Sequence, residues 1–386
     1  MSPSLLQLRR ITSSGRFVPE IDGLRFVAIA SVVVTHLYAF VLINRVVPDT
    51  HDALRTLVEH GYRGVNLFYV ISGFILGLPF AAHYLKGKRA VPLRPYFLRR
   101  LTRLEPPYII NLSICSTLLI LVDGVRVRSL LPHFGASLVY LHSLWFGQQS
   151  MINPVAWTLE VEVQFYCLLP VLAVIFRVRS RLARRMALVG IILLVGIVQM
   201  LYWDGSARAK LTFLYGIQFF LTGLLLADLY VVDWNENPAA NWRWDLVSVV
   251  CWPLIFAPRD LNVWVYLPFL MLATYVGAFK GIVFKRIFRN HIVATIGGMC
   301  YTIYLFHYQL ITAVLRFSKP VHLGKGFDTY FALQFLIYAP ILLLVSCSYF
   351  ALVERPCMAR DWPQRAFHRI IRLAKVKPRE RQVAPS

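Results

Sequence analysis

The sequence predicts an all-α fold, a bundle of about ten transmembrane helices with both chain ends in the cytosol. The composition is 58% hydrophobic and 16% charged over 386 residues, which is too apolar for an ordinary soluble surface. Apolar stretches of about 17 to 25 residues recur along the chain, and each can cross a hydrocarbon core as a helix. We therefore expect one integral-membrane domain over 1–386, with a basic cytosolic start (1–20), a bundle (21–353) and a basic cytosolic tail (354–386).

The positive charge is concentrated between the apolar stretches. The net charge of +22 first suggests nucleic acid, but basic residues in short connections between spans mark the cytosolic side of a membrane protein. We therefore expect the lipid bilayer as partner and no nucleic acid. The clusters are Arg9 to Arg25, Lys86 to Arg103, Arg177 to Arg185, Lys280 to Arg289, and the tail from Arg355 to Arg381.

Ten spans follow from this charge pattern. The segment 245–258 is the weakest, because it is short and contains two prolines. The segment 133–150 is expected to be re-entrant or interfacial on the outer side, since a further span would place the Arg177 to Arg185 cluster outside. No cleavage site follows the first span, so we expect it to be retained. The spans are 21–43, 62–80, 104–122, 155–176, 186–203, 211–231, 245–258, 262–280, 292–315 and 329–352.

The six cysteines lie mostly inside expected spans and form no C-x-x-C pair. They indicate neither a disulfide framework nor a zinc site. We expect no metal and no permanently bound cofactor.

His36 stands in the apolar run "AIASVVVTHLYAFVLI", residues 28–43. An ionisable group in a membrane helix is costly unless it faces the bundle interior or water, which makes it a candidate functional residue. At about 100° per residue, Asp22, Arg25 and His36 lie within about 60° of one another on one face. On position alone, a hydrogen bond of His36 to a neighbouring helix and an Asp22–Arg25 surface pair explain the pattern equally well.

Two carboxylates, Glu160 and Glu162, stand near the outer end of a span in "NPVAWTLEVEVQFYCLLP". Two residues correspond to about 200° on a helix, so the two side chains point in opposite directions. At most one of them can serve a small catalytic site, and both can instead simply reach outer water.

Three further patterns are candidates. Arg100 and Arg103 in "RRLTRLEPPY" lie one helical turn apart and can fork phosphate oxygens, although such arginines often only mark topology. His307 lies about as deep in its span as His36, which favours one shared polar cavity. Ser72, next to a glycine in mid-span, favours close helix packing.

Six segments together resemble acyltransferase family 3, multi-pass bacterial O-acyltransferases that modify surface sugars. They follow the family's order and cover nearly the whole chain. The segments are "IDGLRFVAIASVVVTH" (22–36), "GVNLFYVISGFILG" (64–77), "RRLTRLEPPY" (99–108), "WTLEVEVQFYCLLP" (157–170), "YTIYLFH" (301–307) and "VERP" (353–356).

The resemblance implies transfer of an acyl group, commonly acetyl, from cytosolic acyl-CoA to a hydroxyl of a carbohydrate, glycolipid or similar acceptor outside. It implies a multi-pass protein of the bacterial inner membrane without the extracytoplasmic hydrolase-like domain of some members. His36 matches the family's first-helix histidine and Glu162 its glutamate, while a glutamate at position 160 is less usual. The remaining matched residues are candidates for substrate binding: Asp22, Arg25, Ser72, Arg100, Arg103, Trp157, Tyr304 and His307.

We expect His36 to act as a base, since neutral imidazole can take the proton of a hydroxyl nucleophile. Glu162 is the expected partner that orients the ring, because Asp22 lies about 21 Å away along the same helix. His36 acting as an acyl-carrying nucleophile remains open. Phosphates held at Arg100 and Arg103 would lie roughly 15 to 20 Å from His36 along the membrane normal, which predicts a channel for the pantetheine arm.

The main alternative is a transporter or flippase for an anionic glycolipid or polysaccharide precursor, with His36, Arg25 and Glu162 relaying protons. Such proteins often contain paired discontinuous helices and internal two-fold similarity, and the sequence has neither signal. Acceptor, acyl chain and oligomeric state are not determined by the sequence.

Overall fold

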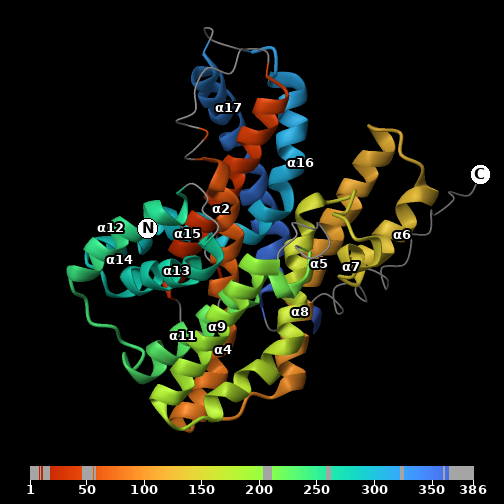
Figure 1. Cartoon of the computed structure of the whole chain (residues 1–386). Coiled ribbons are helices and arrows are strands. Elements are labelled where there is room, and N and C mark those ends of the chain that lie inside the picture. Colours follow the sequence, from red (N-terminus) through yellow and green to blue (C-terminus); the bar gives the residue numbers. More distant parts are fainter. Residues whose placement is uncertain are drawn as a thin grey trace, which may run out of the picture.

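The protein is helical throughout the part that a computed structural model describes, and no strand occurs there (Figure 1). Eight helices in the described part are long and apolar enough to cross a membrane. The all-α membrane fold is therefore confirmed. The described residues are 8, 10–11, 18–45, 55, 58–202, 211–257, 262–321, 326–359 and 361–364.

The eight candidate spans correspond to eight of the ten expected ones. Many of their outward side chains are apolar and exposed, such as Leu121 and Leu344, as in a protein whose solvent is lipid. The helices concerned are α2 (Pro19–Ile43), α4 (Gly64–Lys86), α5 (Leu93–Leu121), α8 (Trp157–Leu172), α9 (Arg181–Tyr202), α11 (Phe213–Val232), α13 (Val263–Lys280) and α17 (Phe327–Tyr349).

The count of ten spans is not confirmed. The segment expected at 245–258 forms α12 (Arg243–Ile255), whose 13 residues are too few to cross a bilayer core as a helix. The segment expected at 292–315 is divided into α15 (His291–Gly298) and α16 (Cys300–Ser318). Two consecutive glycines precede this break, where helix propensity is lowest.

The segment 133–150 does not contain a spanning helix. It contributes to α6 (Val127–Leu138) and α7 (His142–Phe146), both too short to span. Leu131, Leu144 and Trp145 are exposed on them, which suits the interfacial position expected from the sequence.

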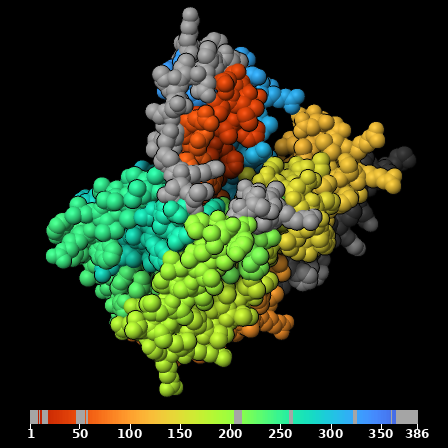
Figure 2. Space-filling model, viewed as in Figure 1, coloured from red at the N-terminus to blue at the C-terminus, as the bar shows by residue number. Residues whose placement is uncertain are grey.

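The helices lie in distinct groups in Figure 1. Helices α4, α8, α9 and α11 form the lower bundle, α2, α16 and α17 project above it, and α12 to α15 lie on one flank. Helices α5 to α7 lie on the other flank. In the space-filling view the red surface of α2 stands between the green-to-teal flank and the yellow flank (Figure 2).

Helices α4 and α11 approach each other closely at two glycines. A Cβ atom at Gly223 of α11 would lie 2.5 Å from the backbone nitrogen of Phe74 and 2.7 Å from Cα of Gly73. Real Cβ contacts of this kind do not occur, so only glycine allows the two backbones to pack this way. This contact sets the position of Ser72, the neighbour of Gly73.

A second close approach joins α15 to α2. A Cβ atom at Gly297 would overlap the carbonyl oxygen of Asp22. Glycine at position 297 therefore permits the end of α15 to rest on the first turn of α2. The chain then turns at Met299 and α16 starts beside α2.

Part of the basic cluster expected at 177–185 is folded inward. Arg184 is 2% exposed and pairs with Asp228 of α11, which is fully buried. Arg185 Nε donates to the same carboxylate at 2.7 Å. Buried charges are tolerated when paired in this way, so these two arginines connect α9 to α11.

Replacing Gly223 by alanine is expected to destabilise the protein. The added methyl group meets backbone atoms of α4 that cannot move without separating the helices, and overpacking of this kind costs about 1–3 kcal/mol. The measurement is the thermal unfolding midpoint of the detergent-solubilised protein. Gly190→Ala is the matched control, because nothing lies within 4 Å of a Cβ atom there and alanine favours a helix. Equal midpoints for the two variants would contradict the packing account.

Candidate active site

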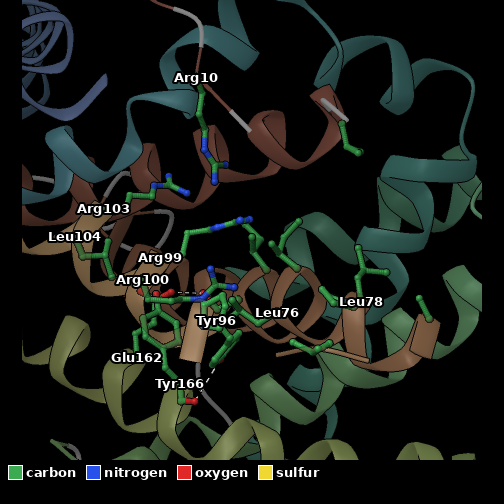
Figure 3. Close-up of a pocket in the computed structure, with 18 of the residues that line it drawn as sticks. Arg10, Leu76, Leu78, Tyr96, Arg99, Arg100, Arg103, Leu104, Glu162 and Tyr166 are labelled. Carbon is green, nitrogen blue, oxygen red and sulfur yellow. Dashed lines mark hydrogen bonds between the residues drawn. The ribbon is translucent and has the colours of Figure 1, made fainter. Parts of the chain in front are cut away.

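A cavity of about 840 Å³ opens between the N-terminal segment and α4, α5, α8 and α16. Its walls carry seven basic and three acidic side chains, so the cavity is basic. Its arginines converge in Figure 3, where Arg10 reaches down and Arg99, Arg100 and Arg103 extend from α5. The basic residues are Arg10, Arg25, Lys88, Arg89, Arg99, Arg100 and Arg103, and the acidic ones are Glu162, Glu236 and Glu354.

Some of these cations are neutralised within the protein. Asp22, which is buried, pairs with Arg25 at 2.5 Å and with Arg10 at 3.2 Å. Lys88 pairs with Glu236 at 2.5 Å. The expected Asp22–Arg25 pair is thus present, and its arginine lies in the cavity wall.

Arg100 and Arg103 differ from these residues, because in the described part of the chain neither forms an ion pair with a carboxylate. The guanidinium of Arg100 lies over the rings of Tyr96 at 4.8 Å and Tyr166 at 5.8 Å. Stacking on aromatic faces fixes the guanidinium plane without using its charge on an acid. These two cations remain available for an anionic ligand.

Glu162 lies in the cavity wall and accepts a hydrogen bond of 2.6 Å from Ser72 Oγ of α4. Ser72 therefore does more than permit packing. No hydrogen bond joins Glu162 to His36 among the described residues. The structure thus brings Glu162 together with Ser72.

His36 of α2 instead contacts His307 of α16. His36 Nδ1 lies 3.3 Å from His307 Nε2, and the ring centroids are 5.2 Å apart. His307 is fully buried, and His36 is half-buried. Two histidines separated by 271 residues thus form one pair.

The neighbouring carbonyl groups assign the protons of this pair. His307 Nδ1 lies 2.8 Å from the carbonyl oxygen of Tyr304, so this nitrogen carries hydrogen and Nε2 of the neutral ring accepts. His36 Nδ1 faces that acceptor and, at 3.0 Å, the carbonyl oxygen of Val32, so it also carries hydrogen. The lone pair of His36 is consequently on Nε2, which has no hydrogen-bond partner in the described part.

The cavity and the histidine pair are neighbours along α16. Cys300 and Tyr301 of α16 line the cavity, whereas His36 and His307 do not. His307 follows Tyr301 by six residues, or about 9 Å of helix. The expected channel to His36 is thus not continuous in this structure.

Aromatic rings occupy the intervening part of α16. The ring centroids of Tyr301 and Tyr304 are 6.4 Å apart, and those of Tyr304 and His307 are 6.3 Å apart. The Tyr304 hydroxyl donates to Val155 O at 2.6 Å and accepts from Thr158 Oγ1 at 3.1 Å. These bonds attach α16 to the start of α8.

Trp157, the first residue of α8, packs against the apolar core with its ring 6.5 Å from that of Tyr215. It is absent from the residues that line the cavity. Its position therefore accords with packing more directly than with contact to a ligand there.

The structure adds residues that the sequence did not single out. Arg10, Tyr96, Tyr166 and Glu354 all line the cavity. The "VERP" segment did contain Glu354, but its contact with α16 depends on tertiary packing. The tyrosines could not be selected, because the chain has 19 of them.

Glu160 lies on the opposite side of α8 from Glu162, as the helical spacing predicted. It is fully buried, and its Oε2 accepts a hydrogen bond of 2.8 Å from the backbone N–H of Ser143 in α7. Next to Ser143, His142 Nε2 lies 2.8 Å from His133 Nδ1 of α6. Glu160 therefore connects α8 to the pair of short helices α6 and α7, called the α6–α7 hairpin below. Within the described ranges no group of three or more His, Cys, Asp or Glu side chains could hold a metal ion.

Comparison with known proteins identifies relatives of the whole membrane region. A family model described as an acyltransferase domain matches residues 18–353. A putative O-acetyltransferase of Staphylococcus aureus strain COL is 24% identical over 329 residues, which are 78% of this chain and 51% of the relative. The O-acetyltransferase OatA of Staphylococcus aureus strain NCTC 8325 / PS 47 is 21% identical over 330 residues, 78% of this chain and 52% of the relative.

The chain spans about half the length of the curated relatives it matches. No solved structure matches the chain.

The α6–α7 hairpin is expected to loosen at acid pH. Burial, and secondarily the charge of His133, lower the pKa of His142 below its usual value. A histidine with a depressed pKa favours the packed state above its unperturbed pKa of about 6.5, and this contribution is lost as the pH falls. Amide hydrogen exchange in residues 127–146, corrected for intrinsic rates, should accelerate from about pH 7.5 to about pH 5 by a larger factor in the wild type than in His142→Gln, which lacks the titrating ring. An identical change of exchange rate in the two proteins would contradict the assignment.

Proposed function

The chain belongs to the acyltransferase family whose domain it matches over residues 18–353, and on that premise we propose that it is a membrane-bound O-acyltransferase using acyl-CoA. The donor's phosphates bind in the basic cavity, and transfer to an acceptor hydroxyl occurs at the His36–His307 pair. One observation carries this proposal. Helix α16 begins in the cavity wall and carries His307, the ring partner of His36, about 9 Å further along.

The donor site rests on Arg100 and Arg103. A guanidinium forks two phosphate oxygens, and neither arginine has a carboxylate in ion-pair contact among the described residues, so both guanidinium groups are available to a ligand. Arg10 and Arg25 share Asp22, so they contribute less charge. Tyr96 and Tyr166 hold the Arg100 plane in position for the phosphates.

His36 Nε2 acts as the general base. It removes the proton of the acceptor hydroxyl as the oxygen attacks the thioester carbonyl carbon. The C–S bond then breaks, and the imidazolium of His36 gives this proton to the thiolate of CoA. His307 Nε2 accepts the His36 Nδ1–H throughout, so it keeps the reactive lone pair on Nε2 in the way a carboxylate does in a hydrolase triad.

His36 Nε2 is equally placed to act as a nucleophile. In that version it attacks the thioester, the C–S bond breaks, and the CoA thiolate leaves an acyl-imidazolium. The acceptor hydroxyl then takes the acyl group, and its proton passes to the freed Nε2 and from there to the thiolate or to water. Ping-pong kinetics and a trapped acyl-enzyme distinguish this version from direct transfer. The charge on the ring is stabilised by His307 in both versions.

The two sites must be bridged by the donor itself. Its phosphates remain with the arginines while the long pantetheine arm carries the thioester along α16, past Tyr301 and Tyr304. Because His36 and His307 are not among the residues that line the cavity, the arm has to displace side chains along this path. We therefore expect the side chains of Tyr301 and Tyr304 to move when the donor binds.

The basic residues around the cavity support a cytosolic donor side. The acceptor hydroxyl belongs to a carbohydrate, glycolipid or similar molecule on the extracytoplasmic side of the bacterial inner membrane. The Staphylococcus aureus relatives are named as O-acetyltransferases, which supports acetyl as the transferred group.

One observation favours the alternative function, a transporter or flippase for an anionic glycolipid. The break between α15 and α16 is of the kind that forms ion and substrate sites in transporters. The two functions differ in their use of CoA, because a transporter has no need to bind or cleave an acyl-CoA.

His36→Ala is expected to lower acyl transfer by about 100-fold or more, the usual contribution of a general base. The assay follows label from acetyl-CoA to a panel of hydroxyl acceptors with the purified, reconstituted protein. His307→Gln should lower transfer by about tenfold, because a second group positions the base. CoA affinity should be unchanged in both, and His83→Ala, at the far end of α4, is the control. Transfer unaffected by His36→Ala would remove His36 from the mechanism.

Arg100→Gln and Arg103→Gln are each expected to weaken CoA binding by about tenfold or more, since a charge-assisted hydrogen bond contributes about 1.5–3 kcal/mol. Calorimetric titration with CoA measures the effect. Arg128→Gln removes an exposed arginine of α6 outside the cavity and should leave the affinity as it is. If wild-type protein binds no CoA, the transporter is favoured over the transferase.

A further inference from the structure

Glu354 stands where the basic cavity meets the first turn of α16. It is 1% exposed and lines the cavity. Its Oε2 accepts hydrogen bonds from the backbone N–H of Thr302 at 3.2 Å and from Thr302 Oγ1 at 2.5 Å. Its other oxygen, Oε1, is buried without a hydrogen-bond partner.

This carboxylate caps α16 from a distant part of the chain. The residue at the N-cap position itself, Met299, provides no side-chain cap. Free N–H groups at a helix start are satisfied by an acceptor, and a negative charge there also complements the helix dipole. Glu354 therefore anchors the helix that positions His307.

The backbone that carries Glu354 is unusual. Residues Phe350–Glu354 form a π-helical turn, η4, between α17 and α18 (Arg355–Cys357). Such turns rotate side chains out of regular helical register and occur often at functional sites. Here the turn directs the carboxylate at α16 instead of the surrounding lipid.

The basic groups close enough to act on the carboxylate are Arg103 and Arg10. Neither forms a hydrogen-bonded ion pair with it among the described residues. These two cations favour the ionised form of the carboxylate, and that form places a negative charge beside the arginine that we assign to the donor phosphates. A phosphate arriving at Arg103 meets both an attractive guanidinium and a repulsive carboxylate.

We propose that Glu354 is a positioning residue with two separable effects: its cap on α16 holds His307 in register with His36, and its charge limits how tightly the cavity holds phosphate-bearing ligands. The inference rests on the proposed function, because the ligand is taken to be CoA. Limited affinity is useful in a transferase, since product CoA carries the same phosphates as the donor and has to leave. The cap depends on the hydrogen bonds that Oε2 accepts, whereas the charge is shared by both oxygens of the carboxylate, so a neutral side chain with an acceptor oxygen can keep the cap and remove the charge.

Two variants separate the effects. Glu354→Gln keeps an oxygen that can accept from Thr302 and removes the charge, so CoA should bind roughly three- to tenfold more tightly. Amide exchange of residues 300–307 should remain as in the wild type. Glu354→Ala removes the cap as well, so exchange in residues 300–307 should accelerate and kcat should fall more than tenfold.

The control for charge is Glu59→Gln. Glu59 is exposed, pairs with Arg55 and lies outside the cavity, so its loss should change CoA affinity by less than about twofold. CoA affinity that is unchanged or weaker in Glu354→Gln, or equally tightened in Glu59→Gln, overturns the charge effect. Unchanged exchange in Glu354→Ala overturns the cap.

Failure of the inference is distinguishable from failure of the proposed function. If the wild type does not bind CoA, the donor assignment fails, while exchange in Glu354→Ala still tests the cap. If the wild type binds CoA and the Gln and Ala variants behave alike in both measurements, the donor assignment stands and the two-effect account of Glu354 is wrong.

Discussion

The break between α15 and α16 is the constraint on which the site depends. Gly297 lets α15 close onto the first turn of α2, and the chain turns at Met299. As a result, α16 begins in the wall of the basic cavity and rises beside α2. An unbroken helix could not both pack against Asp22 at this end and carry His307 to His36.

The arginines of the bundle differ in whether they pair with a carboxylate. Arg184 and Arg185 are paired with Asp228, and Arg25 is paired with Asp22, because an unpaired charge in an apolar bundle is costly. Arg100 is held over the rings of Tyr96 and Tyr166, and among the described residues neither it nor Arg103 has a carboxylate in ion-pair contact. Arg63 is also buried without a carboxylate in ion-pair contact among the described residues, but it donates to the backbone carbonyl groups of Ile255 and Ala257. Arg100 and Arg103 instead line a cavity where an anionic ligand can offset this cost, which supports a binding function for this pair.

Much of the fold follows from local sequence properties, whereas the contacts of the site do not. The length of the apolar stretches alone located eight spans. It could not reveal that the helix expected at 292–315 is divided after two consecutive glycines. Equal depth suggested that His36 and His307 share a cavity, and the structure brings them into contact. The choice of Glu162 as ring partner came from a template of catalytic triads, and its observed partner is Ser72. Side-chain partners across helices depend on rotation and register, which composition and spacing do not determine.

The most direct test of the account is photo-crosslinking with a CoA thioester whose acyl group carries a photoreactive diazirine. The account predicts adducts within residues 28–43 or 301–310, on the two helices that meet at His36 and His307, and a strong loss of these adducts in the Arg100→Gln, Arg103→Gln double variant. Adducts confined to other helices, or adducts at the histidine pair that persist without the two arginines, would contradict the claim that the cavity holds the phosphates while the acyl group reaches His36.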